Sequence, residues 1–215
     1  ECYNDIALVR NTAWYSEFYQ PLDAHQRFFV APYLDLERRF LDVFVGDTPT
    51  SEYSLPTALA GVDFGTQFTR YGELRLGLYG GVTKPKLNSG SAVIDDEQSS
   101  TVSGVRLRGY FDQLDSLNFP KDGWAGTFQL VKGMEALGSD IDYDRWEGSL
   151  VLAKSFGRHT LNFAMRGSGP ISEDRVPAYV STPWGGFLQQ SGFQTGQLLN
   201  ERYIYGRLIY NYRLL

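Results

Sequence analysis

Hydrophobic and polar residues alternate with a period of two along most of the chain. In residues 73–79, Leu74, Leu76 and Leu78 occupy every second position, and Glu73 and Arg75 stand between and beside them. A helix would distribute these leucines around its axis, whereas a strand collects them on one side. The pattern therefore predicts β-strands with one apolar face and one polar face.

The same alternation recurs in residues 105–112 and 203–214. The predicted apolar faces contain Leu74, Leu76, Leu78, Leu107, Phe111, Ile204, Leu208 and Tyr210. The predicted polar faces contain Glu73, Arg75, Arg106, Arg108, Tyr110, Asp112, Arg207, Asn211 and Arg213. If the polar faces line the lumen of a barrel, its arginines can meet Asp63 and other carboxylates there.

Turn residues divide the chain into about nine expected strands. The expected strands cover 5–20, 27–44, 57–69, 73–82, 100–114, 124–136, 145–157, 159–167 and 201–215. Short connections at 21–26, 70–72, 116–123 and 157–158 alternate with long polar ones at 46–56, 82–99, 138–144 and 168–200. Such alternation of tight turns and long loops is typical of an antiparallel barrel in the bacterial outer membrane.

A soluble β-sandwich would also show alternating strands. Its strands average about 5–6 residues, whereas a strand that crosses a bilayer at a tilt needs about 9–11, so strand length favours the barrel. Aromatic residues near the strand ends suit the interfacial girdles of a barrel. These are Phe28, Phe29, Tyr33, Trp124, Trp146, Tyr210 and Tyr212. Alternation alone does not decide which face meets water.

Composition narrows the possible classes of protein. A chain of 215 residues and 24.3 kDa suits a single domain spanning 1–215. The net charge of −5 disfavours a nucleic-acid binder, and the single cysteine, Cys2, excludes an internal disulfide framework. The 23 glycines, 14 tyrosines and 14 phenylalanines agree with twisted strands.

Residues suited to catalysis or metal binding are sparse. The chain contains no Gly-x-Ser-x-Gly elbow, and His25 and His159 lack a partner at metal-binding spacing. The acidic clusters at 95–97 and 140–144 lack the closing glutamate of a calcium loop. We therefore predict no catalytic residue, no metal site and no cofactor.

A motif near the end resembles a known family. The segment Pro183-Trp184-Gly185-Gly186-Phe187-Leu188-Gln189-Gln190-Ser191-Gly192-Phe193 resembles the in-folding loop of bacterial surface antigen barrels. That superfamily contains outer-membrane assembly factors and two-partner secretion transporters. The form here is most similar to the barrel of patatin-like phospholipase autotransporters, which belong to type V secretion. Segments 17–22, 71–77 and 111–123 support the resemblance.

The resemblance implies a sixteen-stranded barrel in which loop 168–200 folds into the lumen. The loop motif would comprise Gly185, Gly186, Phe187, Gln190, Ser191, Gly192 and Phe193. Assembly factors carry arginine where this chain has Ser191, so the loop would need other contacts, such as a serine hydrogen bond.

The implied function is an outer-membrane translocator and anchor that secretes or displays a patatin-like phospholipase passenger. Its partners would be outer-membrane lipid and lipopolysaccharide, with its own passenger or a client outer-membrane protein, and a homo-oligomer is an open option. Alternatives are an assembly factor, a passive porin and a soluble β-sandwich adhesin. Because the chain begins Glu1-Cys2-Tyr3 without an initiator methionine or signal sequence, it is expected to be an internal piece of a longer precursor.

Overall fold

The computed structural model describes residues 1–8, 10–91, 99–172, 182–186, 190, 192–194 and 196–214. Regular structure in these ranges is almost entirely extended. The first strands are β1 (Cys2–Leu8), β2 (Thr12–Phe18), β3 (Gln20–Pro21), β4 (Phe28–Val45), β5 (Thr48–Gln67), β6 (Gly72–Thr83) and β7 (Lys86–Gly90). They are followed by β8 (Ser100–Asp112), β9 (Asp122–Gly133), the 3-10 turn η1 (Glu135–Leu137), β10 (Tyr143–Phe156), β11 (His159–Gly169), β12 (Thr182–Trp184), β13 (Leu198–Asn200) and β14 (Tyr203–Tyr212). Among the residues described, no helix has the length and apolar character needed to cross a membrane.

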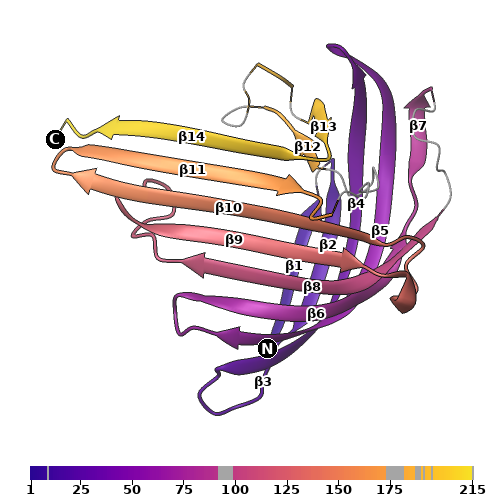
Figure 1. The fold of residues 1–215 in the computed structure, drawn as a ribbon, viewed down its shortest axis with the longest axis horizontal. Helices are drawn as coiled ribbons and strands as arrows, with labels where there is room; N and C mark the ends of the chain where they lie inside the picture. The colour runs from indigo at the N-terminus through magenta and orange to yellow at the C-terminus, as the bar shows by residue number, and fades with distance from the viewer. Residues whose placement is uncertain are drawn as a thin grey trace.

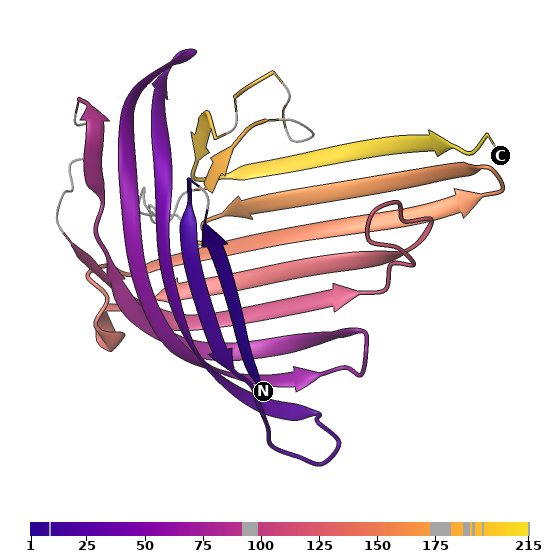
Figure 2. The ribbon, with the colours of Figure 1, turned by 180° about the vertical axis from the view of Figure 1, so that it is seen from behind.

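The main sheet is an antiparallel meander in which neighbours in sequence are neighbours in space (Figures 1 and 2). Its order is β1-β2-β4-β5-β6-β8-β9-β10-β11-β14, and the short strands β3 and β7 bring the sheet to 12 strands. The predicted all-β antiparallel fold is therefore confirmed. The sheet is open, because β1 and β14 form the two ends of its order.

Several predicted segments differ from the structure, among them the connections 82–99 and 168–200, which contain β7, β12 and β13. Residues 5–20 were expected to form one strand, but β1 and β2 pair as a hairpin, and the sequence between them at 9–11 contains neither glycine nor proline. Residues 46–56 were expected to form a connection, but β5 pairs with β4 from Thr48 onward. Pro49 and Pro56 favoured the prediction of a connection, because proline is rare inside sheets. The prediction of about nine strands was therefore too low.

The upper part of the β4–β5 hairpin has a small core of its own. Leu41, Tyr53 and Leu55 are almost fully buried together, and Val43 and Leu87 pack against them. In Figure 1 this hairpin and β7 extend beyond the other strands. Packing of alternate side chains thus continues the sheet past the point where its neighbours end.

Antiparallel pairing places successive connections alternately at the two edges of the sheet, and the two longest lie at the same edge. The connections β2–β4, β5–β6, β8–β9 and β10–β11 share what we call the short-turn edge. The connections β4–β5, β6–β8, β9–β10 and β11–β14 share the long-loop edge. Of these, β4–β5 is a tight turn at the end of the extended hairpin, and the others are longer.

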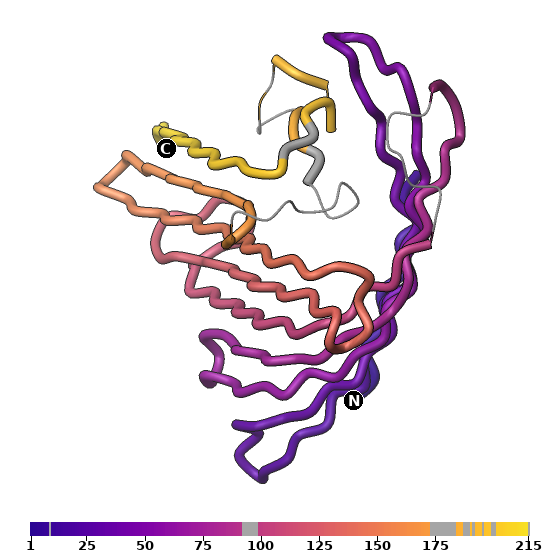
Figure 3. The backbone as a smooth tube through the Cα atoms, turned by 45° about the vertical axis from the view of Figure 1, so that its right-hand side comes forward, coloured from indigo at the N-terminus to yellow at the C-terminus, as the bar shows by residue number. Residues whose placement is uncertain are grey.

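The sheet bends into a trough, with β1–β5 forming one wall and β9–β14 the other (Figure 3). Strand register assigns the two faces. We call polar face the side that carries Arg75, Arg108, Gln129 and Glu147, which pair in one cross-strand row from β6 to β10. The opposite side, the apolar face, carries the alternate residues of each strand.

The apolar face is exposed. Leu76 and Leu78 are 54% and 52% accessible to solvent, so they are not buried against a second sheet. The soluble β-sandwich, which required such burial, is therefore wrong. Phe29 and Tyr33, expected in an outer aromatic girdle, instead lie buried on the polar face, because both share the register of inward-facing Asp63 and Gly65.

Candidate functional site

An ionic network joins four strands on the polar face. The Arg75 guanidinium on β6 lies 2.6 Å from Glu17 on β2, 2.7 Å from Glu73 and 3.8 Å from Asp63 on β5. Arg108 on β8 also binds the Asp63 carboxylate. The pairs Arg75–Glu17 and Arg108–Asp63 connect strands that are not adjacent in the sheet, so they reach across its concave side.

A glycine and a phenylalanine ring surround this network. Gly77 lies between Asp63 and Arg106 in the cross-strand row, and a side chain at this position would collide with the Asp63 carboxylate. The Arg75 guanidinium lies 5.0 Å from the ring centre of Phe29, which itself covers Gly65. The low polarity of these surroundings strengthens each ion pair and penalises any unpaired charge.

Polar contacts continue along the polar face toward β11. Arg166 donates to Glu147 at 3.0 Å, and Arg145 donates to the Ser168 hydroxyl at 2.7 Å. Nearer the long-loop edge, Arg106 lies over the rings of Tyr33 and Tyr79, with its guanidinium carbon 5.0 Å and 5.9 Å from their centres. Arginine side chains therefore contact carboxylate, hydroxyl and aromatic groups along the inner surface.

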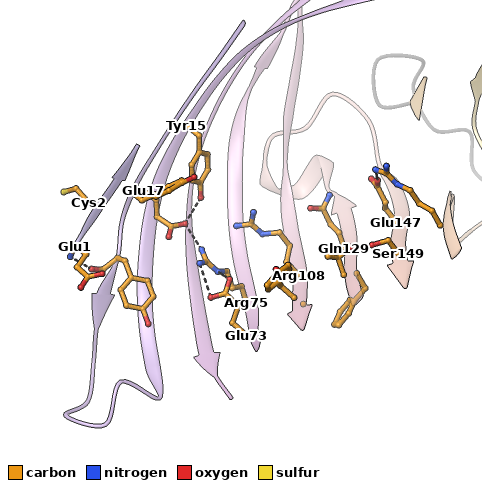
Figure 4. A pocket seen from close by; sticks show the side chains of 18 residues that line it. Glu1, Cys2, Tyr15, Glu17, Glu73, Arg75, Arg108, Gln129, Glu147 and Ser149 are labelled. Atoms are coloured by element: carbon orange, nitrogen blue, oxygen red, sulfur yellow. Dashed lines mark hydrogen bonds and ion pairs between the residues drawn. The ribbon is translucent and has the colours of Figure 1, made fainter. Parts of the chain in front are cut away.

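Glu17, Arg75, Arg108, Glu147 and Arg166 are among the residues that surround a hollow of about 830 Å³. Figure 4 shows Tyr15, Glu17 and Arg75 on one side of it, and Gln129 and Glu147 on the other. Its lining comes from β1, β2, β6, β8, β9, β10 and β11, with Glu1 at its edge, so the curvature of the sheet creates the space. Such a surface offers charged and hydroxyl groups that can bind polar ligands by ion pairs and hydrogen bonds.

Strand register places the residues of the predicted polar faces on one side of the sheet. Glu73, Arg75, Arg106, Arg108, Tyr110, Asp112, Arg207 and Asn211 share the polar face. Arg213 follows β14 and lines a smaller hollow with Asn211 at the short-turn edge. Leu74, Leu76, Leu78, Leu107, Phe111, Ile204, Leu208 and Tyr210 share the apolar face.

The loop before β14 contacts the polar face. The Trp184 ring stacks on Tyr203 with centres 4.4 Å apart, and the Arg166 guanidinium lies 5.9 Å from its centre. Farther along, the Gln197 amide donates to the Gly46 carbonyl and to Asp47 at the tip of the β4–β5 hairpin. This segment therefore touches both walls of the trough.

The loop motif is described in part. Gly185 and Gly186 are buried with positive φ angles of 127° and 104°, and Gln190 donates its backbone N–H to the Gly186 carbonyl. Gly192 is exposed, Phe193 is half-buried, and Phe187 and Ser191 lie outside the described residues. Positive φ explains the need for glycine at 185 and 186.

Sequence reasoning gave no role to Glu17 in the ionic network or to Trp184 in anchoring the loop. Both contacts join segments far apart in sequence, and no local pattern encodes them.

The acidic loop residues Asp140 and Asp142 accept backbone hydrogen bonds from Thr101 and Glu135, and residues 95–97 lie outside the described ranges. In the described part of the chain, no group of three or more acidic, histidine or cysteine residues could hold a metal ion.

A curved antiparallel sheet with an exposed apolar outer face and a charged inner face defines the class of outer-membrane β-barrel proteins. Residues 13–212 match the model of the Omp85 superfamily domain, and the chain therefore belongs to this superfamily. No curated protein sequence matches the chain.

Members of this superfamily are outer-membrane proteins of Gram-negative bacteria, with a translocator or assembly role. The domain is a non-catalytic transport barrel, which is compatible with the absence of a predicted active site.

Proposed function

We propose that the chain forms part of an outer-membrane barrel that translocates and anchors an attached polypeptide, with the polar face lining its lumen. The observation that carries this proposal is the opposition of the two faces of one sheet. Leu76 and Leu78 are exposed on one side, and the Arg75 network lies on the other. Lipid would cover the first face and water would fill the second.

The dimensions of the apolar face suit a bilayer. Outward apolar positions in β4 run from Phe28 to Leu36, and those in β6 run from Leu74 to Val82. About ten residues at about 3.4 Å each, tilted by about 40°, span the roughly 25 Å apolar band of an outer-membrane barrel. Tyr210 and Tyr212 stand near the short-turn end of this band, where an aromatic girdle would meet the membrane interface.

The loop at residues 168–200 would fold into the lumen and regulate passage. Its support is the stacking of Trp184 on Tyr203 and the hydrogen bonds of Gln197 to the β4–β5 tip. By resemblance of the motif at 183–193, the passenger would be a patatin-like phospholipase outside these residues. Assembly of client outer-membrane proteins is the alternative within the same superfamily.

Replacing Trp184 by alanine in the full-length protein tests this role. We expect less passenger exposed to added protease on intact cells, at an unchanged level of barrel in the outer membrane. Trp14→Ala is the matched control, because Trp14 lies on the apolar face of β2. Equal passenger exposure in W184A, W14A and the unaltered protein would contradict a transport role for the loop.

A planar-bilayer recording separates transport from a passive porin. For a translocator we expect W184A to raise the steady conductance, because the loop no longer occludes the lumen. A porin would already conduct fully in the unaltered protein, and W184A would leave that conductance unchanged.

A further inference from the structure

Cations stand on the outward side of the sheet where its apolar face ends at the long-loop edge. On the outward side of β4, Arg38 lies between Leu36 and the half-buried Phe40, and on β6 Lys84 follows Val82. Lys132 near the end of β9 and Arg202 just before β14 also lie on the outward side, farther along the sheet. All four side chains are exposed.

Three cations gather on neighbouring strands. Arg38 pairs in register with Pro56, and the Lys84 backbone N–H donates to the Pro56 carbonyl, so Arg38 and Lys84 flank one residue of β5. Lys86 is the register partner of Ser54, one outward position farther up β5. Since adjacent strands lie about 4.8 Å apart, the backbones of Arg38 and Lys84 are about 10 Å apart, within reach of one phosphorylated headgroup.

The charges around this cluster are unbalanced. Among the described residues Arg38, Lys84 and Lys86 form no ion pair, whereas the nearby carboxylates Asp42 and Glu52 both bind Arg10. Asp144, an outward carboxylate next to Lys132, accepts backbone hydrogen bonds from Ile171 and Ser172. The outward surface therefore presents net positive charge just above the apolar face.

We propose that Arg38, Lys84 and Lys86 bind the phosphate groups of lipid A, the phosphorylated lipid of the leaflet beside the long loops. This inference rests on the proposed membrane placement of the apolar face. Acyl chains cover Leu36 and Val82 below the cluster, and the guanidinium and ammonium groups bind phosphate above them. Lys132 and Arg202 extend the cationic boundary around the sheet.

The test uses the full-length protein in detergent and measures the affinity for diphosphoryl lipid A by native mass spectrometry. We expect the R38Q/K84Q/K86Q variant to bind about 100-fold more weakly, roughly fivefold for each charge removed. The matched control R27Q/K121Q/R158Q removes three exposed cations at the short-turn edge and should keep the original affinity. Dephosphorylated lipid A should bind the unaltered protein as weakly as diphosphoryl lipid A binds the triple variant.

Four results would overturn the site. They are an unchanged affinity in R38Q/K84Q/K86Q, an equal loss in the control, equal binding of phosphatidylglycerol, and competition by inorganic phosphate at concentrations equal to lipid A. If the triple variant does not fold, K84Q and K86Q singly should each lower the affinity about fivefold. Lipid A binding by a protein that moves no passenger would contradict only the transport proposal, and protein that does not enter bilayers would contradict both.

Discussion

Arg108 on β8 binds the buried carboxylate of Asp63 on β5, across the intervening strand β6. The strand between them carries Gly77 at the crossing point, so no side chain separates the two charges. Asp63 is 1% accessible, and Arg108 is 27% accessible. The ion pair thus depends on the curvature of three consecutive strands and on the absence of a side chain at Gly77.

Adding a methyl group at Gly77 should destabilise the barrel. In Gly77→Ala the new carbon collides with the Asp63 carboxylate, and the strain is expected to lower the free energy of unfolding by about 1–3 kcal/mol. Urea unfolding in detergent, followed by tryptophan fluorescence, measures the change. Gly206→Ala is the control, because nothing lies within 4 Å of a carbon added there. Equal stability of the two variants would show that Asp63 moves aside without cost.

Removing the Asp63 charge should leave Arg108 without its carboxylate partner. We expect Asp63→Asn to cost about 2 kcal/mol, less than the roughly 3–5 kcal/mol of a fully buried pair, because Arg108 is 27% accessible. The double variant with Arg108→Gln should cost less than the sum of the two single variants. If the losses of unfolding free energy in the two single variants add up to the loss in the double variant, the two residues do not interact.

A charge on the apolar face distinguishes lipid from water around Ile204. This side chain is 75% accessible, so Ile204→Arg would change stability little if the face met water. In a bilayer, arginine near the midplane costs about 2–4 kcal/mol, and less near the interface. Unfolding in lipid vesicles measures the difference, with Leu117→Arg in the β8–β9 connection as control. Similar small effects in both variants would place Ile204 outside the hydrocarbon.

The β8–β9 connection should loosen in acid. Backbone N–H groups of Lys121 and Asp122 donate to the Asp115 carboxylate and lower its pKa below the usual 3.8. Because the folded-state pKa is depressed, the stabilisation is present above 3.8 and is lost as pH falls through the lowered pKa. Hydrogen exchange at the Lys121 and Asp122 amides should accelerate in that range. Asp115→Asn should remove the pH dependence, and an unchanged profile in this variant would assign it to another group.

Local alternation predicted the sheet and both of its faces, because strand geometry places every second residue on the same side. It predicted Leu74, Leu76 and Leu78 on one side and Arg75 on the other without knowledge of any neighbour. Alternation cannot predict which strands approach across a curved surface. The contact of Arg75 with Glu17 joins residues 58 positions apart and depends on the bend of β4 and β5 between them.

The boundaries of strands were harder to predict where turn chemistry was weak or misleading. The β1–β2 turn contains Arg10 and Asn11 but no glycine or proline, and thus gave no signal. In β5, Pro56 suggested a loop, yet the flanking Tyr53 and Leu55 bury against Leu41 and keep the strand extended. Packing therefore overrode the local preference of these residues.

The ion pairs Arg75–Glu17 and Arg108–Asp63 cross the concave side of the curved sheet. Each one ties strands that are separated by others, and together they fix the bend of the wall between β2 and β8 from its inner side. A wall whose bend is fixed in this way does not rely on its edges for its shape. Strands could separate at one seam of the barrel while this segment kept its radius, which would let a lateral opening form without flattening the lumen.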